Sequence, residues 1–125
     1  ANITLVDQDA LSLDVVRQRH AGGGALFEAA NVFAFLRRAG LAGERYDLVY
    51  TLGLTDYLDD RAMTLLHRLL ARVVAPGGRA VIANFRADLF FTGWMEAVMD
   101  WWLIYREAAE LGEFGAAAGF ASRTW

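Results

Sequence analysis

The chain has 125 residues, a length that predicts one domain, and 56% of them are of hydrophobic types while 22% are charged. That composition excludes a disordered tail and provides the apolar surface for one core. The basic residues are 12 arginines against 15 acids, and the net charge of -3 disfavours non-specific nucleic-acid binding. The absence of cysteine excludes disulfides and thiolate chemistry.

No uncharged apolar stretch approaches the roughly 20 residues that a membrane span needs. The sequence therefore predicts a cytoplasmic protein with neither a membrane nor a nucleic acid as its partner. The chain begins at Ala1 and enters a strand-like run at once, which does not resemble a signal peptide. We expect that these residues are cut from a longer chain.

Short apolar runs alternate with helix-like patterns along the chain. In chain order we expect a strand at 3–6, a helix at 10–20, a strand at 25–30, a helix at 32–39, a strand at 46–52, a helix at 60–74, a strand at 79–85 and a long aromatic helix at 92–111. Asp9 and Asn31 are expected N-caps, Gly40 is expected at the end of the second helix, and a further strand is expected near Phe120. The alternation predicts a single α/β domain over 1–125 with a mostly parallel sheet and right-handed crossovers.

Ligands of parallel sheets bind beyond the carboxyl ends of the strands, so the residues after each expected strand are the candidates for a site. Asp7, followed by Gln8, can accept both hydroxyl protons of a ribose, or it is a solvated turn acid. Asn31 either bonds an adenine edge or only caps the following helix. Val32 would then form an apolar wall beside the base.

The run at 46–52 is the best strand of the chain, and it ends at Thr51, Leu52 and Gly53. Glycine there allows a ligand to approach the backbone closely. Asp56 orients a substrate or acts as a base, or it only complements the dipole of the next helix. Tyr57 adds a phenol beside it.

The expected helix at 92–111 carries an aromatic stripe that includes Trp94, Trp101 and Tyr105. Such a stripe is typical of a core, and the alternative is a substrate pocket or a partner surface. Arg106 falls on the core-facing side. There it needs either a structural carboxylate or the carboxylate of a substrate.

The two histidines, His20 and His67, are isolated in the sequence, and we interpret both as surface or boundary residues. No cluster of His, Asp and Glu has the spacing of a metal site, so no metal is expected.

Three segments together resemble the central part of a class I S-adenosylmethionine-dependent methyltransferase: ITLVDQDAL, YDLVYTLGLTDYLDD and RLLARVVAPGGRAVIANF. The resemblance covers about residues 2–86 and implies a three-layer α-β-α Rossmann-like fold with S-adenosyl-L-methionine as the cofactor. It implies that Asp7, with Gln8 beside it, binds the ribose of the cofactor. Asn31 and Val32 match the positions beside the adenine, where the family more often has Asp. Residues 51–53 match the stretch that lines the methionine part.

A later segment, FTGWMEAVMDWWLIYR, resembles a bacterial subgroup that forms methyl esters of 3-hydroxy fatty acids. This resemblance implies that Trp94, Trp101 and Tyr105 contact an acyl chain and that Arg106 receives its carboxylate. Asn84 and Arg86, at the end of the last expected strand and just after it, are further candidates for contact with this small-molecule substrate. Positioning and desolvation would supply most of the catalysis.

The first strand of that family, with its Gly-rich cofactor loop, has no counterpart in these residues. We expect it upstream of Ile3, and in the sheet between the strands at 3–6 and 46–52. Without it two inner edges are unpaired, and the chain alone binds the cofactor weakly or not at all unless missing segments or a homodimer complete the sheet.

Two other classes of function stay open from the sequence. An NAD-linked Rossmann oxidoreductase also places an acid such as Asp7 after a strand, although it needs a Gly-rich first loop. A non-catalytic module could dimerise through the Trp-rich helix.

Overall fold

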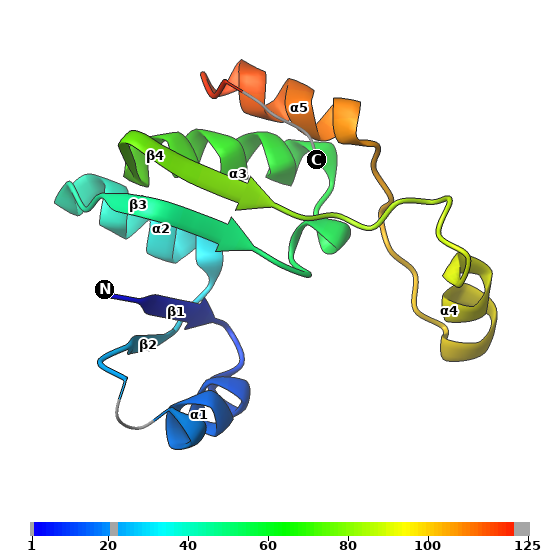
Figure 1. Cartoon of the computed structure of the whole chain (residues 1–125), viewed down its shortest axis with the longest axis horizontal. Coiled ribbons are helices and arrows are strands. Elements are labelled where there is room, and N and C mark those ends of the chain that lie inside the picture. Colours follow the sequence, from blue (N-terminus) through cyan, green and yellow to red (C-terminus); the bar gives the residue numbers. More distant parts are fainter. Residues whose placement is uncertain (1, 21–22, 122–125) are drawn as a thin grey trace. The chain divides into compact units, whose positions relative to one another are not determined.

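The computed structural model describes residues 2–20 and 23–121, and its helices and strands alternate as in an α/β protein (Figure 1). The chain divides into two compact units, Ala1–Glu44 and Arg45–Trp125. Each unit contains one pair of strands, and both pairs are parallel. The expected α/β class with parallel strands is therefore confirmed. Among the described residues the strands form two separate two-stranded sheets.

The first unit is a strand-helix-strand-helix segment. Its elements are β1 (Thr4–Asp7), α1 (Ala10–Arg19), β2 (Leu26–Ala29) and α2 (Val32–Ala42). The carboxylate of Asp9 accepts a hydrogen bond from the backbone N–H of Leu11 at 3.0 Å, so the expected N-cap of α1 is confirmed. In the sheet, Asp7 lies opposite Ala29, which brings the carboxyl ends of β1 and β2 to one edge.

Helix α2 is longer than the sequence pattern predicts. Its expected end near Gly40 is wrong, because the helix continues to Ala42 and its C-cap is Gly43. Gly43 has a φ of 75°, the left-handed conformation that commonly ends helices, and its N–H donates back to the carbonyl of Gly40. Three side chains of α2 are buried in the core: Phe35, Leu36 and Ala39.

The second unit is built on one strongly amphipathic helix. Its elements are β3 (Tyr46–Thr51), the short 3₁₀ helix η1 (Thr55–Tyr57), α3 (Asp60–Val73), β4 (Val74–Ile82), α4 (Thr92–Met99) and α5 (Ala108–Ala117). The apolar face of α3 is less than 5% exposed at Met63, Leu66, Leu69, Leu70 and Val73. Burying each such side chain contributes about 1.5–3 kcal/mol, which makes this face the main core of the unit.

Strand β4 begins directly after α3, five residues before the expected start at Arg79. Its first residue, Val74, pairs with Tyr46, and the register shifts before Arg79 pairs with Leu48. Gly78 lies within that irregular stretch. A Cβ atom built there would lie 2.9 to 3.1 Å from three backbone oxygens, so the close approach of β4 to β3 requires glycine at this position.

The long aromatic helix expected at 92–111 is wrong. Helix α4 ends at Met99, Asp100 adopts a left-handed φ of 50°, and helical structure resumes only in α5. The intervening backbone bonds to other segments: the N–H of Ile104 donates to the carbonyl of Asp56 at 2.8 Å, and the N–H of Arg106 donates to that of Phe85 at 3.1 Å. These long-range hydrogen bonds replace the i to i−4 bonds that a continuous helix needs.

The C-terminal segment also differs from expectation. Residues 108–117 form α5, and no strand begins near Phe120 within the described residues, which end at 121. None of the helices in the described ranges is long and apolar enough to cross a membrane.

Candidate functional site

A pocket of about 370 Å³ lies at the carboxyl ends of β3 and β4. Because the two strands are parallel, the loops that leave them start at the same edge of the sheet. Five of the residues predicted for the site are brought together here. The lining consists of Leu52, Gly53, Asp56, Ala83, Asn84, Phe85, Arg86 and Leu89.

The turn after β3 leaves open space beside the backbone. Gly53 has a φ of 72°, and a Cβ built there would have no atom within 4 Å. The side-chain oxygen of Thr51, two residues earlier, is buried and has no hydrogen-bond partner among the described residues. A buried hydroxyl without a hydrogen-bond partner costs free energy, so a polar ligand that bonds to Thr51 would be favoured here.

Asp56 is a buried carboxylate in the wall of the pocket, with only 2% of its surface exposed. Its Oδ1 accepts a hydrogen bond from the backbone N–H of Phe85 at 2.6 Å. This bond ties the loop after β3 to the loop after β4. Within residues 2–20 and 23–121, no hydrogen bond to its other oxygen, Oδ2, is found.

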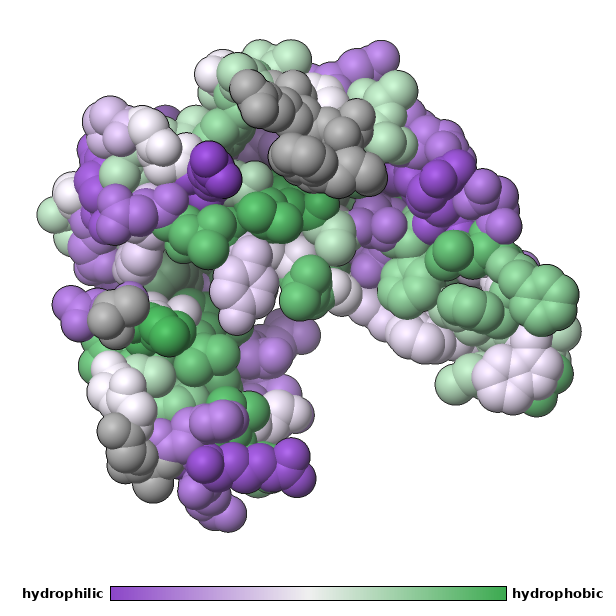
Figure 2. Space-filling view, in the orientation of Figure 1, coloured by the Kyte–Doolittle hydropathy of each residue, from purple (hydrophilic) through white to green (hydrophobic). Residues whose placement is uncertain are grey.

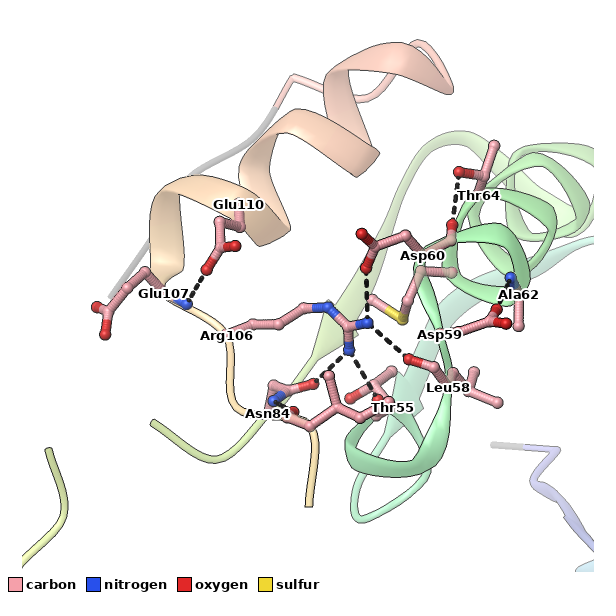
Figure 3. A network of polar contacts seen from close by, with 12 residues as sticks. Thr55, Leu58, Asp59, Asp60, Ala62, Thr64, Asn84, Arg106, Glu107 and Glu110 are labelled. Atoms are coloured by element: carbon pink, nitrogen blue, oxygen red, sulfur yellow. Dashed lines mark hydrogen bonds and ion pairs between the residues drawn. The ribbon is translucent and has the colours of Figure 1, made fainter. Parts of the chain in front are cut away.

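Arg106 links the segment after β3 to the loop after β4 (Figure 3). Its Nη1 donates to the carbonyl of Thr55 at 3.1 Å and to Oδ1 of Asn84 at 3.4 Å. Its Nη2 donates to the carbonyl of Leu58 at 2.6 Å and to Oδ1 of Asp60 at 2.9 Å. The structural carboxylate that the sequence allowed is therefore Asp60.

Asn84 belongs to the same network. Its amide nitrogen donates to the carbonyls of Phe85 and Ile104, at 3.0 and 2.8 Å, while its oxygen accepts from Arg106. Both ends of the amide are thus engaged by the protein, although Asn84 also lines the pocket.

Arg86 stands at the pocket with its charge already paired. Its guanidinium lies 2.8 Å from a carboxylate oxygen of Asp88 and 3.4 Å from one of Glu107. The side chain is 54% exposed, so solvent screens these ion pairs as well.

An aromatic group adjoins the pocket. The indole Nε1–H of Trp101 donates to the hydroxyl of Tyr57 at 2.7 Å, and the Trp101 ring meets the ring of Phe85 edge-on at 6.1 Å. The hydroxyl of Tyr105 is buried and has no hydrogen-bond partner among the described residues. Burial, and then the carboxylate of Glu96, raises the pKa of Tyr105 above its ordinary value.

The remaining predicted residues lie at the carboxyl edge of β1 and β2 in the first unit. Asp7 is exposed, and its Oδ1 accepts a hydrogen bond from the N–H of Asp9 at 2.8 Å; Gln8 is also exposed. The oxygen of Asn31 accepts from the N–H groups of Phe33 and Ala34, so its capping role is confirmed. Contact of Asn31 and the half-buried Val32 with an adenine stays a prediction.

The interpretation of His67 as a surface or boundary residue is wrong, whereas His20 is exposed as expected. His67 is 4% exposed, its Nδ1 lies 2.8 Å from the carbonyl of Met63, and its ring stacks on Phe114 at 5.7 Å. Burial lowers the pKa of His67. His67 lies four residues after Met63 and three before Leu70 on α3, and this helical spacing was the sequence signal for a buried face.

Sequence reasoning singled out Leu52 but not the other apolar residues that line the pocket. Ala83 and Phe85 belong to the expected strand at 79–85, and Leu89 lies in the loop that follows. Leu58 and Asp60 were also missed as acceptors for Arg106. Their role depends on contacts 46 and 48 positions apart in the chain, which no local pattern reveals.

A scan against protein-family models found no family that matches this chain, and a search of curated proteins found no significant match.

Among the described residues, no group of three or more His, Asp or Glu side chains is placed to hold a metal ion.

Proposed function

We propose that these residues belong to an S-adenosylmethionine-dependent methyltransferase with a Rossmann-like fold, acting on a small-molecule acceptor. The observation that carries the proposal is the pocket at the carboxyl ends of parallel β3 and β4, with the buried carboxylate of Asp56 in its wall. The sequence resemblance places the methyl-transfer site at this same strand end.

The residues present fit the cofactor on two observations within the second unit. The buried hydroxyl of Thr51 lacks a partner among the described residues, and the turn at Gly53 is open beside the backbone. In this proposal Thr51, Leu52 and Gly53 hold the methionine part. Bound S-adenosylmethionine would supply an electrophilic methyl group.

Within the first unit, the proposal assigns the ribose to Asp7 and Gln8, which are exposed at the end of β1. The Oδ1 of Asp7 is engaged by Asp9, and this holds the carboxylate in a fixed orientation. Asn31 and Val32 are assigned to the adenine. Because the oxygen of Asn31 caps α2, its amide N–H₂ group is what it can offer to a ring nitrogen.

The chain's own contribution to the chemistry centres on Asp56. Its Oδ1 accepts a hydrogen bond from the N–H of Phe85, so its other oxygen can take a hydrogen bond or a proton from the molecule that is to be methylated. Tyr57 is proposed as a second catalytic group, oriented by Trp101. The proposal gives Arg106 no contact with the substrate. Its guanidinium already donates to four oxygens of the protein, and it does not line the pocket.

Thermal-shift assays test this assignment on two proteins: the 125-residue chain and the longest chain that its reading frame encodes. We expect S-adenosylmethionine and its demethylated product to raise the melting temperature of the longer chain, with NAD giving no shift. The chain as printed should respond weakly or not at all. Stabilisation of the longer chain by NAD alone would instead favour an oxidoreductase.

A second candidate function is favoured by a specific surface. Green and near-white side chains gather over the part of Figure 2 where Figure 1 draws α4. Phe90, Trp94, Val98 and Trp102 are each more than half exposed there. An apolar patch of this kind is typical of an interaction surface, so a module that dimerises through the α4 region is the alternative.

Analytical ultracentrifugation separates this alternative from a monomeric chain. If the patch mediates association, the double variant Trp94→Ser, Trp102→Ser should sediment as a monomer where the unmodified chain does not. Leu41→Ser, which removes an even more exposed apolar side chain from α2, is the control and should leave association unchanged. An unmodified chain that is monomeric at high concentration would contradict the dimerisation module.

A further inference from the structure

We infer that the pocket at the ends of β3 and β4 takes a protonated amine with a short apolar body, in preference to a carboxylate. The inference rests on the proposed function, because it gives the chemical class of acceptor for the same pocket. It departs from the fatty-acid carboxylate that the sequence resemblance implies. Three features of the pocket carry it.

The first feature is the single acidic residue in the pocket lining. Asp56 is 2% exposed and lines the pocket, and its Oδ1 is fixed by the N–H of Phe85. A buried carboxylate is stable when hydrogen-bond donors, charged or polar, surround it. Within the described residues, Oδ2 has no such donor. A ligand ammonium donates three N–H groups and carries the complementary charge, so it satisfies this oxygen directly.

The second feature is that the neighbouring cations are already paired. Arg86 lies against Asp88 and Glu107, so two acidic partners surround one basic group. Arg106 donates to two backbone carbonyls and also to side-chain oxygens of Asn84 and Asp60. It is not part of the pocket lining. A carboxylate ligand would therefore be repelled by the charge of Asp56, and the lining has no free cation that would offset this repulsion.

The third feature is the apolar remainder of the wall. Leu52, Ala83, Phe85 and Leu89 supply hydrocarbon around the single acid. The volume of about 370 Å³ falls in the range of small-molecule sites, roughly 300–1,000 Å³. A short alkyl or aryl group attached to the amine fits this lining.

Titration with three probes of equal chain length tests the inference: hexylammonium, hexanol and hexanoate. The reporter is the indole N–H signal of Trp101 in ¹H–¹⁵N spectra, assigned with Trp101→Phe, because this ring lies against the pocket residue Phe85. We expect hexylammonium to bind most tightly, hexanol more weakly and hexanoate weakest. Equal or tighter binding of hexanoate would overturn the inference.

Asp56→Asn keeps an oxygen that can accept from Phe85 but removes the charge. We expect it to weaken the binding of hexylammonium at least about tenfold relative to the unmodified chain, because the hydrogen bond to the ligand loses its charged acceptor. Asp47→Asn is the matched control: it removes one exposed acid on β3 outside the pocket and should leave binding unchanged. Unchanged hexylammonium binding in Asp56→Asn would overturn the inference.

A second variant leaves Asp56 in place, in case its replacement disturbs folding. Leu89→Arg adds a cation to the pocket wall, and we expect it to weaken hexylammonium and to strengthen hexanoate. No reversal of that order would count against the inference. The titrations contain no S-adenosylmethionine, so their failure removes the amine assignment alone, while the thermal-shift assays decide the methyltransferase proposal separately.

Discussion

The guanidinium of Arg106 is buried while the carboxylate that pairs with it is not: the side chains of Arg106 and Asp60 are 3% and 82% exposed, with Nη2 and Oδ1 2.9 Å apart. The other acceptors of the guanidinium are the carbonyls of Thr55 and Leu58 and the amide oxygen of Asn84. Arg106 therefore contributes to stability mainly by satisfying oxygens of the loops, and less through its ion pair.

Removal of the two partners should consequently have unequal effects. We expect Arg106→Ala to lower the free energy of unfolding by about 3–5 kcal/mol, because it leaves buried acceptors without donors and opens a cavity. Asp60→Ala should cost less than about 1 kcal/mol, the usual limit for an exposed ion pair. Urea denaturation measures both.

Two further variants sharpen this comparison. Arg106→Lys should recover only part of the loss, since an ammonium cannot reproduce the planar fork that reaches four acceptors. Arg61→Ala, an exposed neighbour on α3, should change stability by no more than about 0.5 kcal/mol. Equal losses for Arg106→Ala and Asp60→Ala would show that the ion pair dominates.

Glycine at position 78 should be required by the packing of β4 on β3. A Cβ there meets the carbonyl oxygens of Ala75, Asp47 and Tyr46 at 2.9, 3.0 and 3.1 Å, and backbone atoms cannot rotate away. We expect Gly78→Ala to destabilise the chain by about 1–3 kcal/mol, as overpacking does. Gly93→Ala in α4 meets nothing within 4 Å and should be neutral or stabilising by about 0.5–1 kcal/mol.

The buried His67 should make stability fall in mild acid. Burial lowers its pKa from the ordinary value of 6.5, so just below that pH the unfolded chain binds a proton that the folded chain does not. The free energy of unfolding therefore decreases as the pH falls through 6.5, until the folded state also takes up the proton. Urea denaturation at pH 7.5 and 5.5 measures this loss.

Variants at the two histidines isolate that effect from the carboxylates. His67→Phe keeps a ring against Phe114 and should show a smaller loss between the two pH values. His20→Gln, at an exposed position, should retain the full loss. The same pH dependence in all three chains would mean that groups other than His67 cause it.

Local features of the fold were predictable from the sequence, because neighbouring residues determine them. Apolar runs such as 46–52 located the strands, and the Asx side chains of Asp9 and Asn31 located two helix starts. The candidate pocket followed from one general rule, that parallel strands gather their carboxyl ends at one edge. Asp56, Asn84 and Arg86 were named as candidates on that basis. They line one pocket in the structure, while their roles stay predictions.

Features decided by distant contacts were not predictable in the same way. The sequence from 92 to 111 favours a continuous helix locally, but the backbone of Ile104 bonds to Asp56, 48 positions earlier. The same applies to His67, whose environment includes Phe114 on α5. Local propensity was overridden in each case by hydrogen bonds or packing between elements that are remote in sequence.

Asn31 allows the structural and the proposed ligand-binding roles of one residue to be separated. Its oxygen accepts from Phe33 and Ala34, so Asn31→Ala should lower the free energy of unfolding by about 1 kcal/mol, the usual effect of losing an N-cap. Asn31→Asp keeps the capping oxygen and adds a negative charge at a helix N-terminus, so stability should be retained or raised. Circular dichroism during urea denaturation measures both changes.

The same two variants also address the cofactor. The methyltransferase resemblance more often has Asp at this position, so on the longest chain of the reading frame Asn31→Asp should bind S-adenosylmethionine at least as tightly as the unmodified chain. Asn31→Ala should bind it more weakly by more than its stability loss explains, as measured by calorimetry under conditions where both chains are folded. If Asn31→Ala binds the cofactor normally, Asn31 is only a helix cap and the adenine contact must be made by other residues.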